Sequence, residues 1–422
     1  MASATTAPDW LAARRESAAA LAGELELPTT KTKGWEFTDL SGLDLEAFAQ
    51  APGARLAGPA LTPDDAPLQP PEGALELVQL DGAPVGDPDE AAADDAPIVL
   101  PLSLAVERHP DLVQAHLGSI VTGDDPFVAR NEAAWTGGLF VYVPRNATLE
   151  ASVIATATQA TGGSAVNWRT LIVLEEGAQA EVWEQSRSAR EDLEGLFNTV
   201  VELRVGPNAN LRYINAQALS ERSWVFGSQR AEVDRDGALD WVALAFGSAR
   251  GKVRMETNLS GQGANARITG AYAGHGRQHL DYDTTQEHAA PSTTSDLAFR
   301  GVLLDRATAV WRGMIRVEEG AQKTDAFQES RNLLLSKRAH ADAIPGLEIE
   351  ADDVRCTHAA AIAQVDREQL YYLRSRGLKR DEATRLVVEG FMQELVERFP
   401  KGAAHDALSA ALERRLADVL DG

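Results

Sequence analysis

The sequence predicts a mainly β fold in which a parallel β-helix, or solenoid, lies between an N-terminal and a C-terminal helical region. A short turn motif recurs at nearly constant spacing, strand-like apolar runs lie between its copies, and both ends of the chain show helical periodicity. We expect residues 1–135 to form an N-terminal helical region with a Pro- and Asp-rich spacer, residues 136–362 the β-helix core, and residues 363–422 a C-terminal helical domain.

The turn motif is the main evidence for a solenoid. Gly or Asn precedes an alanine in each clear copy, which fits a left-handed backbone at a corner. A β-sandwich also has short strands and turns, but it has no reason to repeat one turn about every 30 residues. Two later copies, LLDRATAV and VEEGAQKT, keep the motif but lose the spacing. The regular copies are VPRNATLE, LEEGAQAE, VGPNANLR and the looser VDRDGALD, with central residues Ala147, Ala178, Ala209 and Ala238.

The N-terminal region is predicted to be helical at both of its ends. Asp9 is a candidate N-cap for a helix that ends near Gly23, and KGWEFTDLSGLDL (33–45) supplies aromatic and leucine core anchors. Residues 51–96 are a spacer in which only Leu75–Leu80 resembles a strand, and its acidic piece DPDEAAADD is expected to be solvated. Short helices are expected over 104–117 and 126–135.

The C-terminal region is predicted to contain three helices. Asp366 and Asp381 are candidate N-caps, and Pro400 separates the last two helices. Leu408, Leu412, Leu416 and Leu420 form a line at i, i+4 spacing. Because a short helical unit cannot hide so many apolar positions alone, we expect this region to pack on the β body or on a partner.

Composition limits the function classes. With 40 basic and 63 acidic residues the chain has a net charge of −23, which argues against nucleic-acid binding and against docking on anionic lipid. One cysteine excludes an intrachain disulfide, and no export signal or membrane-spanning run is evident, so a cytoplasmic protein is expected. Nucleotide-binding, nucleophile-elbow and HExxH motifs are absent from the sequence, so no enzyme activity is expected.

The candidate site lies in the stretch from Glu350 to Gly377, where strand periodicity gives way to helical periodicity. Cys356 and His358 lie two residues apart, so on a strand their side chains point to the same face. One thiol and one imidazole supply at most part of a metal coordination sphere, so any remaining ligands must come from elsewhere. The alternative is that Cys356 is a packing residue and His358 an ordinary histidine.

A second constellation permits an enzyme interpretation. His279, Asp281 and His288 could form a metal triad, and Asp281 with Asp283 could form a carboxylate pair of the kind used by sugar-cleaving enzymes. Neither pattern is specific, because acidic pairs are common in a chain this negative. Surface or inter-strand hydrogen bonding is the competing interpretation, and a β-helix carbohydrate-active enzyme remains an alternative function.

The runs AQKTDAFQESRNLLLSKRAHADAIPG (321–346) and LEIEADDVRCTHAAAIAQVDREQLYYLRSRG (347–377), with NEAAWTGGLFVYVP (131–144) and KGWEFTDLSGLDL, resemble the SufB and SufD family of iron-sulfur cluster assembly proteins, and SufD members in particular. The resemblance implies a right-handed parallel β-helix and a non-catalytic scaffold. A SufB-like chain is the second possibility, but SufB members carry a cysteine in the segment that corresponds to Ser336–Pro345, where this chain has none. Ala359 stands where many relatives have glycine.

The same resemblance implies the partners and the cargo. It implies a SufB-like paralogue paired through the β-helix edges, a SufC-like ABC ATPase bound by the C-terminal region, and a homodimer as the possible state of the isolated chain. It also implies a transient iron-sulfur cluster or iron at the SufB interface; a bound flavin is possible but has no support in the sequence. His358 matches the family histidine that faces this interface, and Cys356 is the second candidate ligand.

Overall fold

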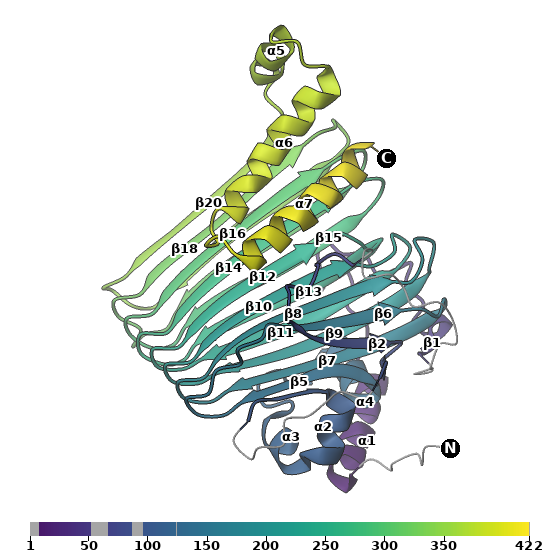
Figure 1. The fold of residues 1–422 in the computed structure, drawn as a ribbon, viewed down its shortest axis with the longest axis vertical. Helices are drawn as coiled ribbons and strands as arrows, with labels where there is room; N and C mark the ends of the chain where they lie inside the picture. The colour runs from purple at the N-terminus through teal and green to yellow at the C-terminus, as the bar shows by residue number, and fades with distance from the viewer. Residues whose placement is uncertain (1–7, 52–65, 87–95, 124, 422) are drawn as a thin grey trace.

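The structure, a computed structural model, describes residues 8–51, 66–86, 96–123 and 125–421. Its body is a parallel β-solenoid, as the turn repeat predicts, and helices lie at both ends of the chain, as the helical periodicity predicts (Figure 1). The piece DPDEAAADD (87–95) and residues 52–65 of the predicted spacer lie outside the described residues.

The chain alternates between two ten-stranded sheets, here called sheet A and sheet B. From β5 onwards odd-numbered strands belong to sheet A and even-numbered strands to sheet B, so two consecutive strands make one coil. Sheet A contains β1 (Ala49–Gln50), β4 (Ile98–Pro101), β5 (Gly137–Val143), β7 (Ser164–Leu174), β9 (Gly195–Val205), β11 (Trp224–Val233), β13 (Arg250–Leu259), β15 (His279–His288), β17 (Thr308–Val317) and β19 (His340–Ile349). Sheet B contains β2 (Leu75–Leu80), β3 (Ala83–Pro84), β6 (Val153–Gln159), β8 (Gln179–Ser188), β10 (Asn210–Ala218), β12 (Ala238–Ala245), β14 (Asn265–Gly274), β16 (Thr294–Leu303), β18 (Asp325–Leu334) and β20 (Arg355–Gln364).

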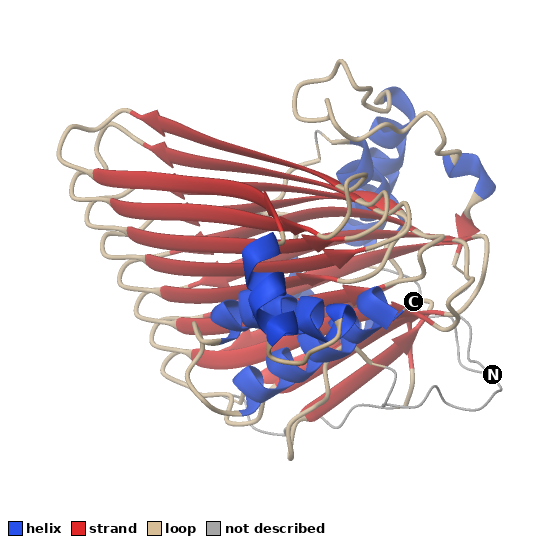
Figure 2. Ribbon diagram, turned by 90° about the horizontal axis from the view of Figure 1, so that it is seen from above, coloured by secondary structure: helices blue, strands red, loops and turns tan. Residues whose placement is uncertain are grey.

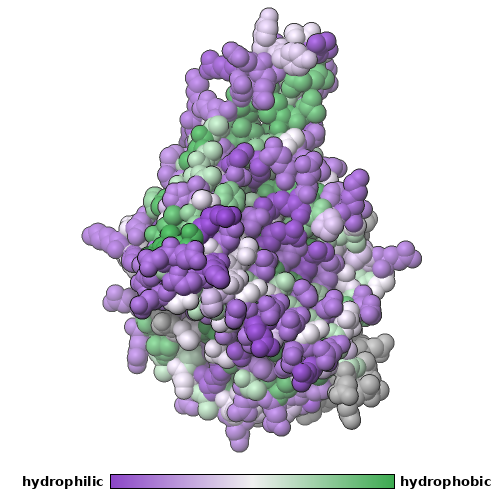
Figure 3. Space-filling model, turned by 90° about the vertical axis from the view of Figure 1, so that its left-hand side faces the viewer, coloured by the Kyte–Doolittle hydropathy of each residue, from purple (hydrophilic) through white to green (hydrophobic). Residues whose placement is uncertain are grey.

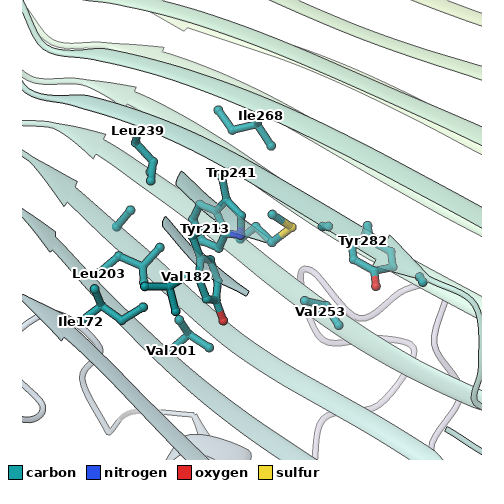
Figure 4. Close-up of a cluster of buried hydrophobic side chains, with 14 of the residues drawn as sticks. Ile172, Val182, Val201, Leu203, Tyr213, Leu239, Trp241, Val253, Ile268 and Tyr282 are labelled. Carbon is teal, nitrogen blue, oxygen red and sulfur yellow. The ribbon is translucent and has the colours of Figure 1, made fainter. Parts of the chain in front are cut away.

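Alternate side chains of each strand point into the space between the two sheets. In sheet B, for example, Leu211 lies in register with Ala180 on one side and Leu239 on the other, and all three are buried. Such inward residues join into one hydrophobic core that includes Tyr213 and Trp241 (Figure 4). Because the apolar residues of one coil are covered by those of the next, no coil is stable alone.

The predicted turn repeat is the corner at which the chain passes from sheet A to sheet B. One residue at each of these corners has a positive φ, and its backbone N–H donates to a carbonyl of the following coil at 2.6–3.2 Å. Gly, Asn and Asp tolerate this conformation best, which explains why the motif prefers them. The seven residues are Asn146, Gly177, Asn208, Asp236, Gly263, Ser292 and Lys323.

Two irregular copies of the motif, VDRDGALD and LLDRATAV, have structural explanations. In VDRDGALD the residue after the left-handed Asp236 is Gly237, so Gly237 and not Ala238 takes the place of Ala178 and Ala209. LLDRATAV lies between β16 and β17, at the opposite corner of the coil, where Asp305 has the positive φ. Its spacing differs because it belongs to a different set of turns.

The N-terminal region combines helices with strands that close the first coil. The predicted strand Leu75–Leu80 is confirmed as β2, which is parallel to β6, whereas β3 and β4 are antiparallel to β2 and β5. The first helix has Pro8 and not Asp9 at its N-cap position. The helices are α1 (Asp9–Glu24), the 3-10 turn η1 (Leu45–Ala47), α2 (Leu102–Arg108), α3 (Pro110–His116) and α4 (Pro126–Ala134).

A buried ion cluster fixes these helices to sheet A. Arg169 on β7 is inaccessible to solvent and contacts Glu132 of α4 at 2.8 Å and Glu202 of β9 at 2.7 Å. Glu202 also accepts backbone N–H groups of Gly118 and Ile120, at 2.8 and 3.0 Å. Arg14 of α1 forms a second ion pair with Glu132, so two cations balance the two carboxylates. A neutral cluster with hydrogen-bonded oxygens meets the conditions under which buried charges are tolerated.

The C-terminal helices α5 (Arg367–Ser375), α6 (Arg380–Val396) and α7 (Ala403–Asp421) follow β20, and the helices of the molecule lie outside the stacked strands (Figure 2). Leu408, Leu412 and Leu416 are buried in a cluster with the outer face of sheet B. These three leucines of the line are therefore covered within the chain and are not available to a partner. Asp366 caps α5 as predicted, through Glu368 N, whereas the N-cap residue of α6 is Lys379 and not Asp381.

The solenoid interior contains a carboxyl group without a cation. Glu184 on β8 accepts hydrogen bonds from Thr170 and Asn215 and, at 3.0 Å, from the Tyr213 hydroxyl, and no described residue forms an ion pair with it. Burial raises the pKa of Glu184 above 4.5, against the lowering effect of these hydrogen bonds. The folded chain therefore holds this proton more strongly than the unfolded chain does.

The first prediction concerns Glu184→Gln, which keeps the shape of the side chain but cannot ionise. A group with a raised folded pKa contributes full stability below its unfolded pKa and loses it as pH rises through the folded value. The variant should therefore melt a few degrees above the wild type at pH 7.5, and the difference should shrink towards pH 4. Thermal unfolding across this range tests it, with exposed Glu397→Gln as control. A lower melting temperature for Glu184→Gln at pH 7.5 would contradict the expectation.

The second prediction concerns His288, which is fully buried and bonded to Thr293 Oγ1 at 2.7 Å and Ser295 Oγ at 2.8 Å. Burial lowers the pKa of His288 from 6.5 to about 4. Between these values the unfolded chain binds more protons, so stability is lost as pH falls from about 6.5 to 4, by about 3 kcal/mol in total. Chemical denaturation of His288→Gln should show a shallower pH dependence than the wild type, whereas His340→Gln at an exposed position should not. Parallel curves for His288→Gln and wild type would remove this role.

Candidate functional site

The last coil of the solenoid forms an open end. β19 and β20 each have a strand partner on one side only among the described residues. Cys356, His358 and Ile362 lie in register with Ala326, Gln328 and Asn332 of β18, which are buried between the sheets. These β20 side chains therefore face the solenoid interior, but no further coil covers them.

The open end exposes apolar side chains that earlier coils would bury. Leu347 and Ile349 on β19 are 38% and 41% exposed, and Ile362 on β20 is 44% exposed. Figure 3 shows hydrophobic surface gathered in the upper part of the molecule, below the tip formed by α5. Free backbone edges beside exposed apolar side chains are the usual features of a surface that pairs with another chain.

Cys356 and His358 lie on one face, as predicted, but their surroundings differ. Cys356 is half-buried and packs against a small cluster that includes Ile315 and Val317. Burial, and secondarily the carboxylate of Asp325, raises the pKa of the Cys356 thiol above 9.0. Because thiolate and not thiol is the metal ligand, this environment favours the packing role for Cys356 in the isolated chain.

His358 is exposed at the open end, and no described residue hydrogen-bonds its imidazole. The contrast with other histidines is clear, since both ring nitrogens of His288 and of His279 are occupied by hydroxyl groups. A free, solvent-facing imidazole can donate a lone pair to a metal or accept a proton. Of the two candidate residues, His358 is therefore the one whose side chain is free to contact another molecule.

The part of the chain that the structure describes contains no complete metal site. Among the residues that the structure describes, no three His, Cys, Asp or Glu side chains are grouped closely enough to hold a metal ion. Four ligands are usual for iron-sulfur clusters and structural zinc. Cys356 and His358 supply at most two such ligands.

The alternative site on β15 is not assembled. Strand alternation places His279 and Asp281 on the outer face of sheet A, whereas His288 faces the interior, so the imagined triad is wrong. Asp281 is bound by Lys252 Nζ at 2.9 Å and by the Thr38 hydroxyl, and Asp283 is contacted by Arg312 at 3.5 Å. Both carboxylates are ion-paired with basic side chains and do not form a free catalytic pair.

The contacts of Asp281 hold the KGWEFTDLSGLDL segment against sheet A. Trp35 stacks on Phe127 at 5.5 Å between ring centroids, and Trp35, Leu40 and Leu43 are buried as expected for core anchors. Lys252 lies 5.8 Å from the centroid of the Trp35 ring. The residues that suggested an enzyme therefore serve to attach the N-terminal region.

A second exposed surface, on α5 and α6, has no counterpart among the predictions from the sequence. Tyr371 and Tyr372 on α5 are 75% and 56% exposed, and Leu386 on α6 is 50% exposed. α5 has no buried residue and lies beyond β20, at the open end of the solenoid (Figure 1). The sequence does contain one indication of this surface, the adjacent tyrosines in a polar helix. Consecutive side chains of a helix point in different directions, so both are rarely buried against one core.

No helix in the described part of the chain is both long enough and apolar enough to cross a lipid bilayer.

Comparisons with known proteins find one family. A family model described as "SUF system FeS cluster assembly, SufBD core domain" matches residues 154–391. The iron-sulfur cluster assembly protein SufD of Bacillus subtilis is 29% identical over 418 residues, which cover 97% of this chain and 94% of that protein. Iron-sulfur cluster assembly SufBD family proteins of Staphylococcus epidermidis and Staphylococcus saprophyticus are 29% and 30% identical over 298 residues, covering 70% of this chain and 64% of each relative.

Proposed function

We propose, because the chain belongs to the SufBD family of iron-sulfur cluster assembly proteins, that it is a non-catalytic scaffold subunit of a SUF complex. In this role it pairs with a SufB-like paralogue and docks a SufC-like ABC ATPase. The observation that carries the proposal is the open end of the solenoid, where two strand edges, apolar side chains and one free imidazole occur together.

Pairing through the open end suits the physical chemistry of a solenoid. A paralogue with the same coil dimensions can continue both sheets, supply the missing backbone hydrogen bonds and cover Leu347, Ile349 and Ile362. A second copy of this chain is the alternative occupant when the paralogue is absent. Co-purification of the chain with each candidate partner tests the assignment.

His358 is the proposed contribution of this chain to a transient iron or iron-sulfur cluster, which is cargo of the complex. A neutral imidazole can replace thiolate on iron, and the sulfur ligands would come from a cysteine of the paralogue. Asp366, which caps α5 immediately after β20, fixes the end of the strand that presents His358. Cys356 is the weaker candidate because its thiol is half-buried and its pKa is raised.

The ATPase is proposed to dock on α5 and the first turns of α6. The leucine line of α7 is not part of this docking surface, because sheet B covers it. Tyr371, Tyr372 and Leu386 are the apolar side chains that remain exposed there. Removing residues 366–422 is therefore a poor test, since it would also uncover the outer face of sheet B.

The third prediction is that His358→Ala leaves the three-subunit complex assembled and its ATPase active but lowers cluster formation in cells that depend on this system. The loss should be about tenfold or more, since one ligand of a shared site is removed. Cys356→Ser should have a smaller effect. Activity of a cluster-dependent reporter enzyme measures the outcome.

His340→Ala provides the matched control, because His340 is also exposed on the last coil but is paired with Asp342 at 3.1 Å. Equal cluster formation by His358→Ala and wild type would remove the ligand assignment without affecting the fold or the partners.

The fourth prediction is that Tyr371→Ala combined with Tyr372→Ala weakens ATPase binding about tenfold or more, because exposed tyrosines are frequent binding hot spots. Stability should change by only about 0.5 kcal/mol, since neither ring is buried. Titration calorimetry with the purified ATPase measures the loss. Val85→Ala, at an exposed position on the first coil, is the control, and undiminished binding by the tyrosine variant would exclude α5 as the docking site.

A further inference from the structure

The α5–α6 tip, defined as residues 371–380 (YYLRSRGLKR), is basic although the chain has a net charge of −23. It carries four cations and no acidic residue, and eight of its ten residues are exposed, Leu373 and Leu378 being partly buried. None of the four cations is in an ion pair with a described residue. They are Arg374, Arg376, Lys379 and Arg380.

Helix stability explains only half of these cations. Arg374 and Arg376 lie at the C-terminal end of α5, where positive charge is favourable. Lys379 and Arg380 instead occupy the N-cap and first position of α6, where positive charge opposes the helix dipole. Asp381 and Glu382 in the same turn offset this cost, but they do not explain why the cations are there.

The tip is also held in a defined shape. Gly377 has a φ of +99° and ends α5, with its N–H donating to Arg374 O at 3.0 Å. The Arg376 guanidinium lies 5.1 Å from the Tyr372 ring centroid. The tip thus presents tyrosines and cations together on a preformed turn, and Tyr and Arg are enriched in protein interfaces.

We propose that the α5–α6 tip recognises an acidic protein surface, and that this surface belongs to the ATPase partner. The inference rests on the proposed docking of the ATPase at α5 and adds the chemistry of the contact. The tyrosines supply apolar contact area, while the cations attract the partner and orient it before contact. The rest of the chain is negative and repels an acidic partner, so the partner is expected to bind at the basic tip.

A basic and aromatic surface also fits single-stranded nucleic acid. Nucleic acid carries a negative charge at every phosphate and would extend from the tip over the surrounding negative surface, whereas a protein partner needs only a local acidic patch that meets the tip. The protein partner is therefore favoured, and nucleic acid becomes an outcome of the test.

The test uses Lys379→Glu combined with Arg380→Glu in the full chain. Acidic residues at a helix N-terminus stabilise it, so the variant should fold at least as well as the wild type. Its association with the purified ATPase, measured by surface plasmon resonance at low salt, should be about tenfold slower, because like charges now face each other. Wild-type association should slow as salt rises, and the variant should show a weaker dependence.

Lys337→Glu combined with Arg338→Glu is the matched control, since both residues are exposed and the change in net charge is the same. It should leave association close to the wild-type rate. Unchanged or faster association of the tip variant would overturn the inference about charge. In that case, loss of binding by the variant with Tyr371→Ala and Tyr372→Ala would still support docking of the ATPase at α5. No binding by the wild type would instead refute the proposed docking. Tip-dependent binding of a labelled single-stranded oligonucleotide, with ATPase binding unaffected, would overturn the inference in favour of nucleic acid.

Discussion

Each coil of this solenoid depends on its neighbours for two things at once: partners for its backbone N–H and C=O groups, and cover for its inward side chains. The corner hydrogen bonds add a third link, since each left-handed residue donates to a carbonyl of the next coil. In the middle of the stack these backbone groups and side chains have partners on both sides. At each end of the stack they have a partner on one side only. The closing strands and the candidate site follow from how the two ends of the stack are completed.

Corners were the part of the fold most visible in the sequence. Gly177, Asn208 and their equivalents are dictated locally, because few residue types accept a positive φ, so the coil length could be read directly. Which side of a strand a residue faces was also predictable for Cys356 and His358, which are two apart. The same alternation could have separated His288 from His279, since nine residues place them on opposite faces.

Other features depend on contacts between distant segments and left no local pattern. The leucine line of α7 predicts an apolar face but not its partner, which is sheet B. The engagement of Asp281 by Lys252 and Thr38 requires β13, β15 and the segment around Trp35 to meet, across about 240 residues of chain. The exposure of Tyr371 and Tyr372 likewise becomes evident only once α5 is placed beyond the last coil.

The first coil is closed by strands whose free edges are poorly suited to pairing with a further strand. β3 has two residues and contains Pro84, and β4 runs antiparallel to β5 and ends at Pro101. Short, proline-bearing edges resist the addition of further strands. A rod that accepted copies at both ends would grow as a cross-β fibril does. In the described ranges of this structure, only the end formed by β19 and β20 offers long unpaired strands. If two such ends pair, both become covered, so growth through strand edges would stop at two chains and would not continue into a fibre.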